Sequence, residues 1–222
     1  MTGYNQKRLT FTQNQPLLWG LLHGLNDLTA GFMLANYTLT HAYAESFMLL
    51  VIYSIIGFGG QLPVGFWIDH KKQVKPFAFI SLTTLILAIL IYFINGYAAI
   101  ILAGIASAFV HVTGGAVCLQ VNNNKSAPLA LFTAPGILGL TLGGILGKFP
   151  SYGLWFVLAG VVCLSFFILR NKLPVYKSPQ KMQSQLDIHD WLMLGILLIM
   201  CFRSFIFDVV NHVAYQYPNG IV

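Results

Sequence analysis

Long apolar segments follow one another along almost the whole of this chain, and each is long enough to cross a bilayer. A helix needs about 20 apolar residues to span the hydrocarbon core. Only 8% of the residues are charged, whereas a soluble domain usually carries about 25%. Because a soluble domain still needs a polar surface, the surplus of apolar side chains must face lipid. The sequence therefore predicts an all-α polytopic membrane protein, with seven spans at Leu17–Leu39, Ser46–Ile68, Phe77–Ile94, Tyr97–Val121, Leu129–Leu146, Tyr152–Leu169 and Trp191–Val213.

Positive charge alternates sharply between the loops that join these spans. Of the 12 Lys and Arg residues, ten lie in the N-terminal tail or in the loops after the second, fourth and sixth spans. The other two are Lys148, in the opposite set of loops, and Arg203, inside the seventh span. Basic loops stay on the cytoplasmic side. We therefore expect a multi-pass protein of the plasma (inner) membrane, with a cytoplasmic N-terminus and the C-terminus as given outside. The net charge of +6 reflects the basic loops that set the orientation in the membrane. We expect no nucleic-acid partner, because the sequence has no basic helix face.

The spans and loops divide the chain into four parts. Residues 1–16 form a cytoplasmic tail, and residues 17–169 form an N-terminal six-helix transmembrane bundle. Residues 170–190 are a basic, proline-containing cytoplasmic linker. Residues 191–222 are a seventh transmembrane helix and an outer tail, the start of an incomplete second bundle.

A glycine–aspartate motif lies between the second and third spans, within residues 57–75. Gly65 stands four residues before Asp69, and basic residues follow. This pattern resembles the loop motif of the major facilitator superfamily, although His70 and Lys72 stand where that motif usually has its arginine and its second glycine. The resemblance implies that Gly65 and Asp69 form a gate latch at the cytoplasmic mouth. The alternative is a topogenic basic loop with an incidental aspartate.

Other stretches are similar to bacterial facilitators of the fosmidomycin-resistance kind and to their uncharacterised relatives. These stretches are residues 22–32, 109–115, 131–139 and 203–205. The resemblance implies a fold of two six-helix bundles with a substrate cavity between them. The sequence covers a six-helix facilitator bundle plus a seventh transmembrane helix. A second six-helix bundle is therefore required, from the missing C-terminal part or from another subunit.

Polar residues inside the spans are the candidate site, because ionisable groups at membrane depth usually face a bundle interior or a water-filled path. His23 and Asp27 are four apart and share a helix face, which suits a proton-coupling pair near neutral pH. Asn26, His111 and Arg203 are the candidate substrate-binding residues. The alternatives are structural: a His–Asp hydrogen bond that ties two helices, an interhelical bond from His111, and an internal ion pair for Arg203.

Glycines at helical spacing predict close helix packing, because small residues allow helix backbones to approach. Such residues follow His111 and line the fifth span. A glycine-rich fifth span resembles the antiporter motif of drug/proton exchangers, but it does not match position by position. The predicted packing residues are Gly114, Gly115, Gly139, Gly143 and Gly147.

Taken with the resemblance, these features favour a secondary active transporter, coupled to protons, that moves a small molecule by alternating access. The resemblance implies that the chain is truncated relative to a twelve-helix architecture. Its expected partners are the small-molecule substrate, the proton and the lipid bilayer, with no cofactor, no metal and no enzymatic activity. One alternative is a non-transporting remnant or a membrane assembly partner. A less favoured one is a membrane-embedded metalloenzyme with His23, Asp27 and His111 as ligands, since the sequence lacks a His-Glu-x-x-His helix.

Overall fold

The computed structural model describes residues 14–121, 126–171 and 173–174. The chain divides into two compact units, Met1–Ser178 and Pro179–Val222, and all described residues belong to the first. Most of the predicted tail, most of the linker and the whole seventh span, including Arg203, lie outside the described residues. The described part is helical, with no strand.

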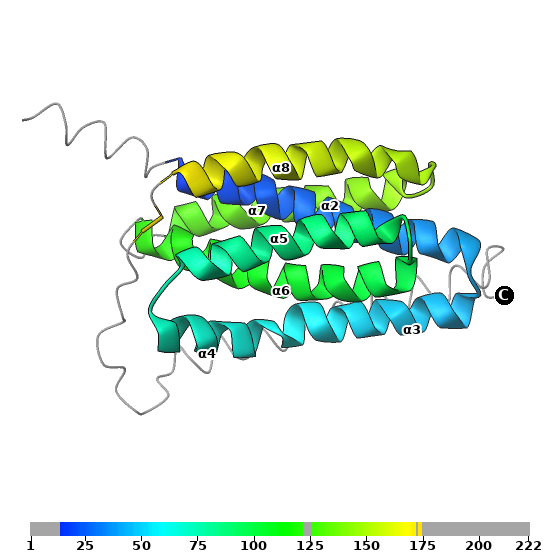
Figure 1. Ribbon diagram of the computed structural model, residues 1–222, viewed down its shortest axis with the longest axis horizontal. Helices are drawn as coiled ribbons and strands as arrows, with labels where there is room; N and C mark the ends of the chain where they lie inside the picture. Colours follow the sequence, from blue (N-terminus) through cyan, green and yellow to red (C-terminus); the bar gives the residue numbers. More distant parts are fainter. Residues whose placement is uncertain (1–13, 122–125, 172, 175–222) are drawn as a thin grey trace, which may run out of the picture. The chain divides into compact units, whose positions relative to one another are not determined.

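Helices laid side by side make up the first unit (Figure 1). Each of the first six predicted spans is helical in the structure. Their predicted ends differ from the observed helix ends by three residues or fewer. The helices are α2 (Gln15–Thr40), α3 (Tyr43–Ser54), α4 (Gln61–Lys71), α5 (Lys75–Tyr92), α6 (Gly96–Val121), α7 (Ser126–Leu146) and α8 (Leu154–Arg170).

The second predicted span is the one that the structure interrupts. Between α3 and α4 the backbone forms a π-helical turn, Ile55–Gly59. Pro63 follows four residues after Gly59 and has no N–H to donate to the Gly59 carbonyl, so the regular ladder cannot continue through this point. The sequence predicts a span from Ser46 to Ile68, and hydropathy alone does not register the missing donor at Pro63.

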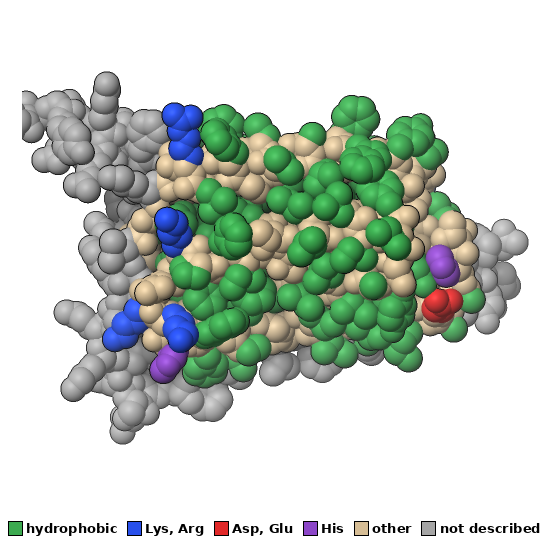
Figure 2. Space-filling model, viewed as in Figure 1, with side chains coloured by type: hydrophobic (Ala, Val, Ile, Leu, Met, Phe, Trp, Pro, Cys, Tyr) green, Lys and Arg blue, Asp and Glu red, His purple; other side chains and the backbone are tan. Residues whose placement is uncertain are grey.

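In the part of the chain that the structure describes, five helical segments are long and apolar enough to cross a membrane: Tyr43–Lys71, Lys75–Tyr92, Gly96–Gln120, Ala127–Leu146 and Ser151–Arg170. At 26 residues, α2 is long enough as well, but it is less apolar because it carries His23, Asn26 and Asp27. Hydrophobic side chains cover the side of the bundle, whereas Lys and Arg gather at one end (Figure 2). Phe156 is 80% exposed and Leu62 and Phe66 are each 70% exposed, as expected for a surface whose solvent is lipid. These features support a multi-pass membrane protein.

At the centre of the unit, α2 packs along α7 and also contacts α6 and α8. Trp19, Leu22 and Met33 on α2 are fully buried. The α2–α7 contact is a backbone contact. A Cβ added at Gly139 would collide with the Gly24 carbonyl oxygen, and one at Gly143 would collide with that of Leu28. Glycine is what lets these two helices approach so closely.

Candidate functional site

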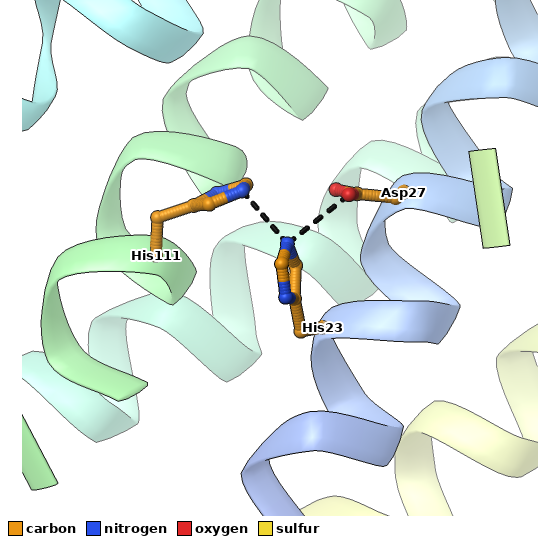
Figure 3. A group of neighbouring side chains, drawn as sticks. All are labelled: His23, Asp27 and His111. Carbon is orange, nitrogen blue, oxygen red and sulfur yellow. Dashed lines mark hydrogen bonds and ion pairs between the residues drawn. The ribbon is translucent and has the colours of Figure 1, made fainter. Parts of the chain in front are cut away.

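Three ionisable side chains from α2 and α6 meet inside the bundle (Figure 3). The Nε2 atom of His23 lies 2.8 Å from Nε2 of His111 and 3.1 Å from Oδ2 of Asp27. His23 and Asp27 are one turn apart on α2, as the sequence predicts, and His111 comes from α6, 88 residues further along the chain. The His23 side chain is 6% exposed and that of Asp27 is 16% exposed.

Backbone carbonyls hold the other nitrogen of each imidazole. Nδ1 of His23 lies 2.9 Å from the Phe132 carbonyl oxygen, and Nδ1 of His111 lies 2.7 Å from the Ser107 carbonyl oxygen. A carbonyl oxygen can only accept. We therefore assign the N–H of each neutral ring to Nδ1, which leaves a lone pair on each Nε2.

This assignment has a consequence for the proton content of the cluster. Two lone pairs 2.8 Å apart repel each other, with the Asp27 carboxylate beside them. One added proton converts the contact into an N–H···N hydrogen bond and produces an imidazolium that the carboxylate neutralises. The cluster is then neutral, whereas without that proton it carries one buried negative charge, which is costly in a low-dielectric setting. The three groups form a site for one proton.

Asn26 and Ser107 support the cluster from beside it. The Asn26 amide donates from Nδ2 to Oδ1 of Asp27 at 2.9 Å and, more weakly, to Oγ of Ser107 at 3.4 Å. Asn26 is 2% exposed, so its amide holds the carboxylate in place in this conformation. Its predicted contact with substrate stays a prediction. Ser107 was not predicted from the sequence, because a single serine in a long apolar span carries no distinctive pattern.

Gly136 and Phe132 on α7 complete the surroundings of His23. The Phe132 ring stacks on the imidazole with the ring centroids 4.7 Å apart. A Cβ at Gly136 would lie 2.5 Å from Nε2 of His23 and 2.7 Å from Oδ2 of Asp27. The sequence places Gly136 among the glycines of the fifth span without a link to the site. Only the α2–α7 packing shows that it makes room for the His23–Asp27 pair.

The cluster lies at the middle of its helices. Asp27 is 12 residues after the first residue of α2, Gln15, and 13 before the last, Thr40. At 1.5 Å per residue, this leaves roughly 18–20 Å of helix on either side. In a helix that spans a bilayer, such a position is close to the midplane, where transporters hold substrates and coupling ions.

The flank of α6 at Gly115, one turn from His111, is open within the described residues. Gly115 lies four residues after His111, on the same face of α6, and none of the described residues comes within 4 Å of a Cβ built there. By contrast, a Cβ at Gly114 would collide with the Phe132 ring. The two adjacent glycines thus differ: Gly114 accommodates an aromatic side chain of α7, and Gly115 borders free space next to His111.

The ligand atoms of His23, Asp27 and His111 all lie within 4.8 Å of one another, so the cluster could also hold a metal ion. Zinc bound to two imidazoles at 2.0–2.1 Å in tetrahedral geometry separates the two nitrogens by about 3.3 Å. The observed separation of 2.8 Å is shorter and is that of a direct hydrogen bond between the rings. The geometry therefore fits a shared proton better than a tetrahedral metal.

The predicted latch residues lie on α4, Gly65 in the middle of the helix and Asp69 near its end. Asp69 is exposed in the last turn of this helix. The nearest described atom to a Cβ built at Gly65 is Val112 Cγ1, at 3.9 Å, which is an ordinary contact. Within the described residues, then, no close neighbour demands glycine at this position, and the latch role of both residues stays a prediction.

The third predicted packing glycine of the fifth span, Gly147, also approaches α2 closely. A Cβ there would lie 2.6 Å from the Phe32 carbonyl oxygen. Gly139, Gly143 and Gly147 are all buried, with Phe132 and Gly136, on one face of α7.

In comparisons with known proteins, no family model, no curated protein and no solved structure matches this chain.

Proposed function

We propose that this chain is part of a proton-coupled secondary transporter that moves a small molecule by alternating access. The observation that carries the proposal is the geometry of the His23–Asp27–His111 cluster. Both Nδ1 atoms bond to backbone carbonyls, so the two Nε2 lone pairs face each other, and that of His23 also faces the Asp27 carboxylate in the interior of the bundle. Such an arrangement binds and releases one proton with a change of net charge at membrane depth, which is the elementary requirement of proton coupling.

The open flank beside Gly115 supplies the second requirement, which is a place for substrate next to the proton. A molecule that binds there contacts His111 and thereby senses whether the shared proton is present. The resemblance to the major facilitator superfamily supports a six-helix facilitator bundle with a second bundle opposite it. In this proposal the second bundle closes the open flank, and it comes from a further part of the polypeptide or from another subunit.

Proton flux in vesicles tests this proposal. Membrane vesicles that contain the full-length protein are given a pH gradient, and pools of small molecules are added while a pH-sensitive dye follows proton movement. We expect at least one pool to move protons through the wild type and none to do so through Asp27→Asn. Glu45→Gln is the matched control, because Glu45 accepts a hydrogen bond from Tyr37 at 2.6 Å, at the outer end of α2.

Two outcomes would overturn the proposal. One is substrate-driven proton movement in Asp27→Asn that equals the wild-type rate. The other is accumulation of a substrate by the wild type that does not respond to the pH gradient. Both variants replace an acid by its amide, so a general effect of removing a carboxylate would appear in the control as well.

A further inference from the structure

A pocket of about 890 Å³ opens at the end of the bundle where α4 ends, α5 begins and α8 ends. Its lining includes Lys72, Lys75 and Arg170, together with the apolar Phe79 and Leu169. The pocket lies at the opposite end of these helices from Lys148 and far from the buried histidines in sequence and along the helix axes. It takes no part in the proton site.

Among the described residues that line this pocket, three are cations and none is acidic. In the described ranges none of the three forms an ion pair. The Arg170 guanidinium lies 5.9 Å from the centroid of the exposed Phe166 ring, a cation–π contact that orients it without neutralising it. Three cations around one cavity repel one another, and an anion in the cavity relieves that repulsion.

Three helix ends meet at the pocket: the C-termini of α4 and α8, and the N-terminus of α5. Lys72 ends α4 in the left-handed conformation, with φ 52°, a helix-terminating position at which glycine is usual. The N-cap residue of α5, Val74, forms no side-chain cap hydrogen bond. The positive end of the α5 dipole is therefore not capped by a side chain where it meets the pocket.

The apolar side of the pocket faces the lipid-covered surface. Phe79 is 57% exposed and Leu169 is 37% exposed, and both lie less than two turns into their helices from the basic end. A ligand that fills the pocket meets charge at the helix ends and hydrocarbon one turn deeper. An amphiphile with a phosphate head matches both parts, whereas a free phosphate uses only the first.

We propose that this pocket binds the phosphate of an anionic phospholipid of the cytoplasmic leaflet, with Lys72, Lys75 and Arg170 on the head group and Phe79 and Leu169 against the acyl chains. Basic pockets between transmembrane helices are recognised sites for such lipids. The inference rests on the membrane location and on the predicted cytoplasmic position of the basic end, and it does not depend on transport.

Native mass spectrometry of the purified full chain tests this site. The protein is released from detergent in the presence of equal amounts of phosphatidylglycerol and phosphatidylcholine, and the lipid affinity is measured for the wild type, Lys75→Gln and Arg170→Gln. Lys148→Gln is the control, since it removes the same charge at the other end of the bundle. All three positions are exposed, so the fold is expected to persist, and circular dichroism checks it.

We expect the wild type to retain phosphatidylglycerol in preference to phosphatidylcholine. Each pocket substitution should weaken that binding about fivefold, and Lys148→Gln should leave it unchanged. Equal retention of the two lipids would overturn the proposal, and so would an equal loss in the Lys148→Gln control. Displacement of the lipid by millimolar inorganic phosphate would show a site for soluble anions and would also overturn it.

Discussion

Gly136 is the single residue whose role changes most between the sequence and the structure. As a member of a glycine row it indicates helix packing. In the folded bundle its missing side chain is the space that the His23 imidazole and the Asp27 carboxylate occupy. A residue with no functional group is thus part of the site, because any Cβ would displace the groups that hold the proton.

Gly136→Ala tests this interpretation. The added methyl group would lie 2.5 Å from the His23 ring, so the ring must shift away from His111 or α7 must move away from α2. We expect a destabilisation of about 1–3 kcal/mol, the usual cost of overpacking, and loss of the substrate-driven proton flux. Thermal unfolding in detergent and the vesicle assay measure the two effects.

Gly115→Ala serves as the control for Gly136→Ala, because none of the described residues lies within 4 Å of its new methyl group. We expect its unfolding midpoint to equal that of the wild type or to exceed it slightly. If Gly136→Ala proved as stable as Gly115→Ala and kept its proton flux, the assigned geometry of the cluster would be wrong.

Lys72 replaces a glycine of the loop motif that residues 57–75 resemble, and this replacement strains the backbone. The motif usually has its second glycine at this position, and Lys72 adopts φ 52°, where a side chain costs about 1–2 kcal/mol. The structure therefore gives a physical reason for a glycine there: α4 ends in a left-handed residue before the chain turns into α5. In this chain a lysine occupies that strained position and lines the basic pocket.

Among the helices, α7 carries the clearest relation between sequence pattern and packing. The buried residues of α7 and of the turn after it recur every three or four positions, which is one face of a helix: Phe132, Gly136, Gly139, Gly143 and Gly147. Their spacing predicts a contact face, but it does not name the partner. The partner is α2, whose carbonyl groups at Gly24, Leu28 and Phe32 lie against these glycines.

Two neighbouring glycines on α7 provide a matched test of this interface. A Cβ at Gly143 would collide with the Leu28 carbonyl, whereas a Cβ at Gly144 meets nothing within 4 Å. We expect Gly143→Ala to lower the stability by about 1–3 kcal/mol. Gly144→Ala should be neutral or raise it by up to about 1 kcal/mol, because alanine is the better helix former. Equal effects in unfolding experiments would contradict the close α2–α7 approach.

For the molecule as a whole, the distribution of positive charge predicts how the bundle is oriented in the membrane. Residues at the two ends of the bundle can be labelled to test that orientation. Lys71, Lys72 and Lys75 lie near one end with Arg170, and Lys148 lies at the other. Three helices, α5, α6 and α7, separate Gln73 from Lys148. An odd number of crossings places these two residues on opposite sides of the membrane.

Cysteine labelling measures that orientation. In a background without Cys118, Cys163 and Cys201, Gln73→Cys and Lys148→Cys are treated with a membrane-impermeant maleimide. We expect Lys148→Cys to react in intact cells and Gln73→Cys to react only in inverted vesicles, because the basic end stays cytoplasmic. The reverse result would invert the orientation, and labelling of both from one side would contradict three membrane crossings.

The positions of the helices, the apolar surface and the candidate polar residues His23, Asp27 and His111 could all be predicted from the sequence. These properties depend on composition and on neighbours within a turn or two, which a linear pattern records. The π-turn before α4, the role of Gly136 and the basic pocket could not be predicted, nor could the anchoring of both imidazoles. His23 meets the Phe132 carbonyl across 109 residues and His111 across 88. Which lone pairs face one another is set by the packing of α2 against α6 and α7, and only that packing brings the two imidazoles and the carboxylate together.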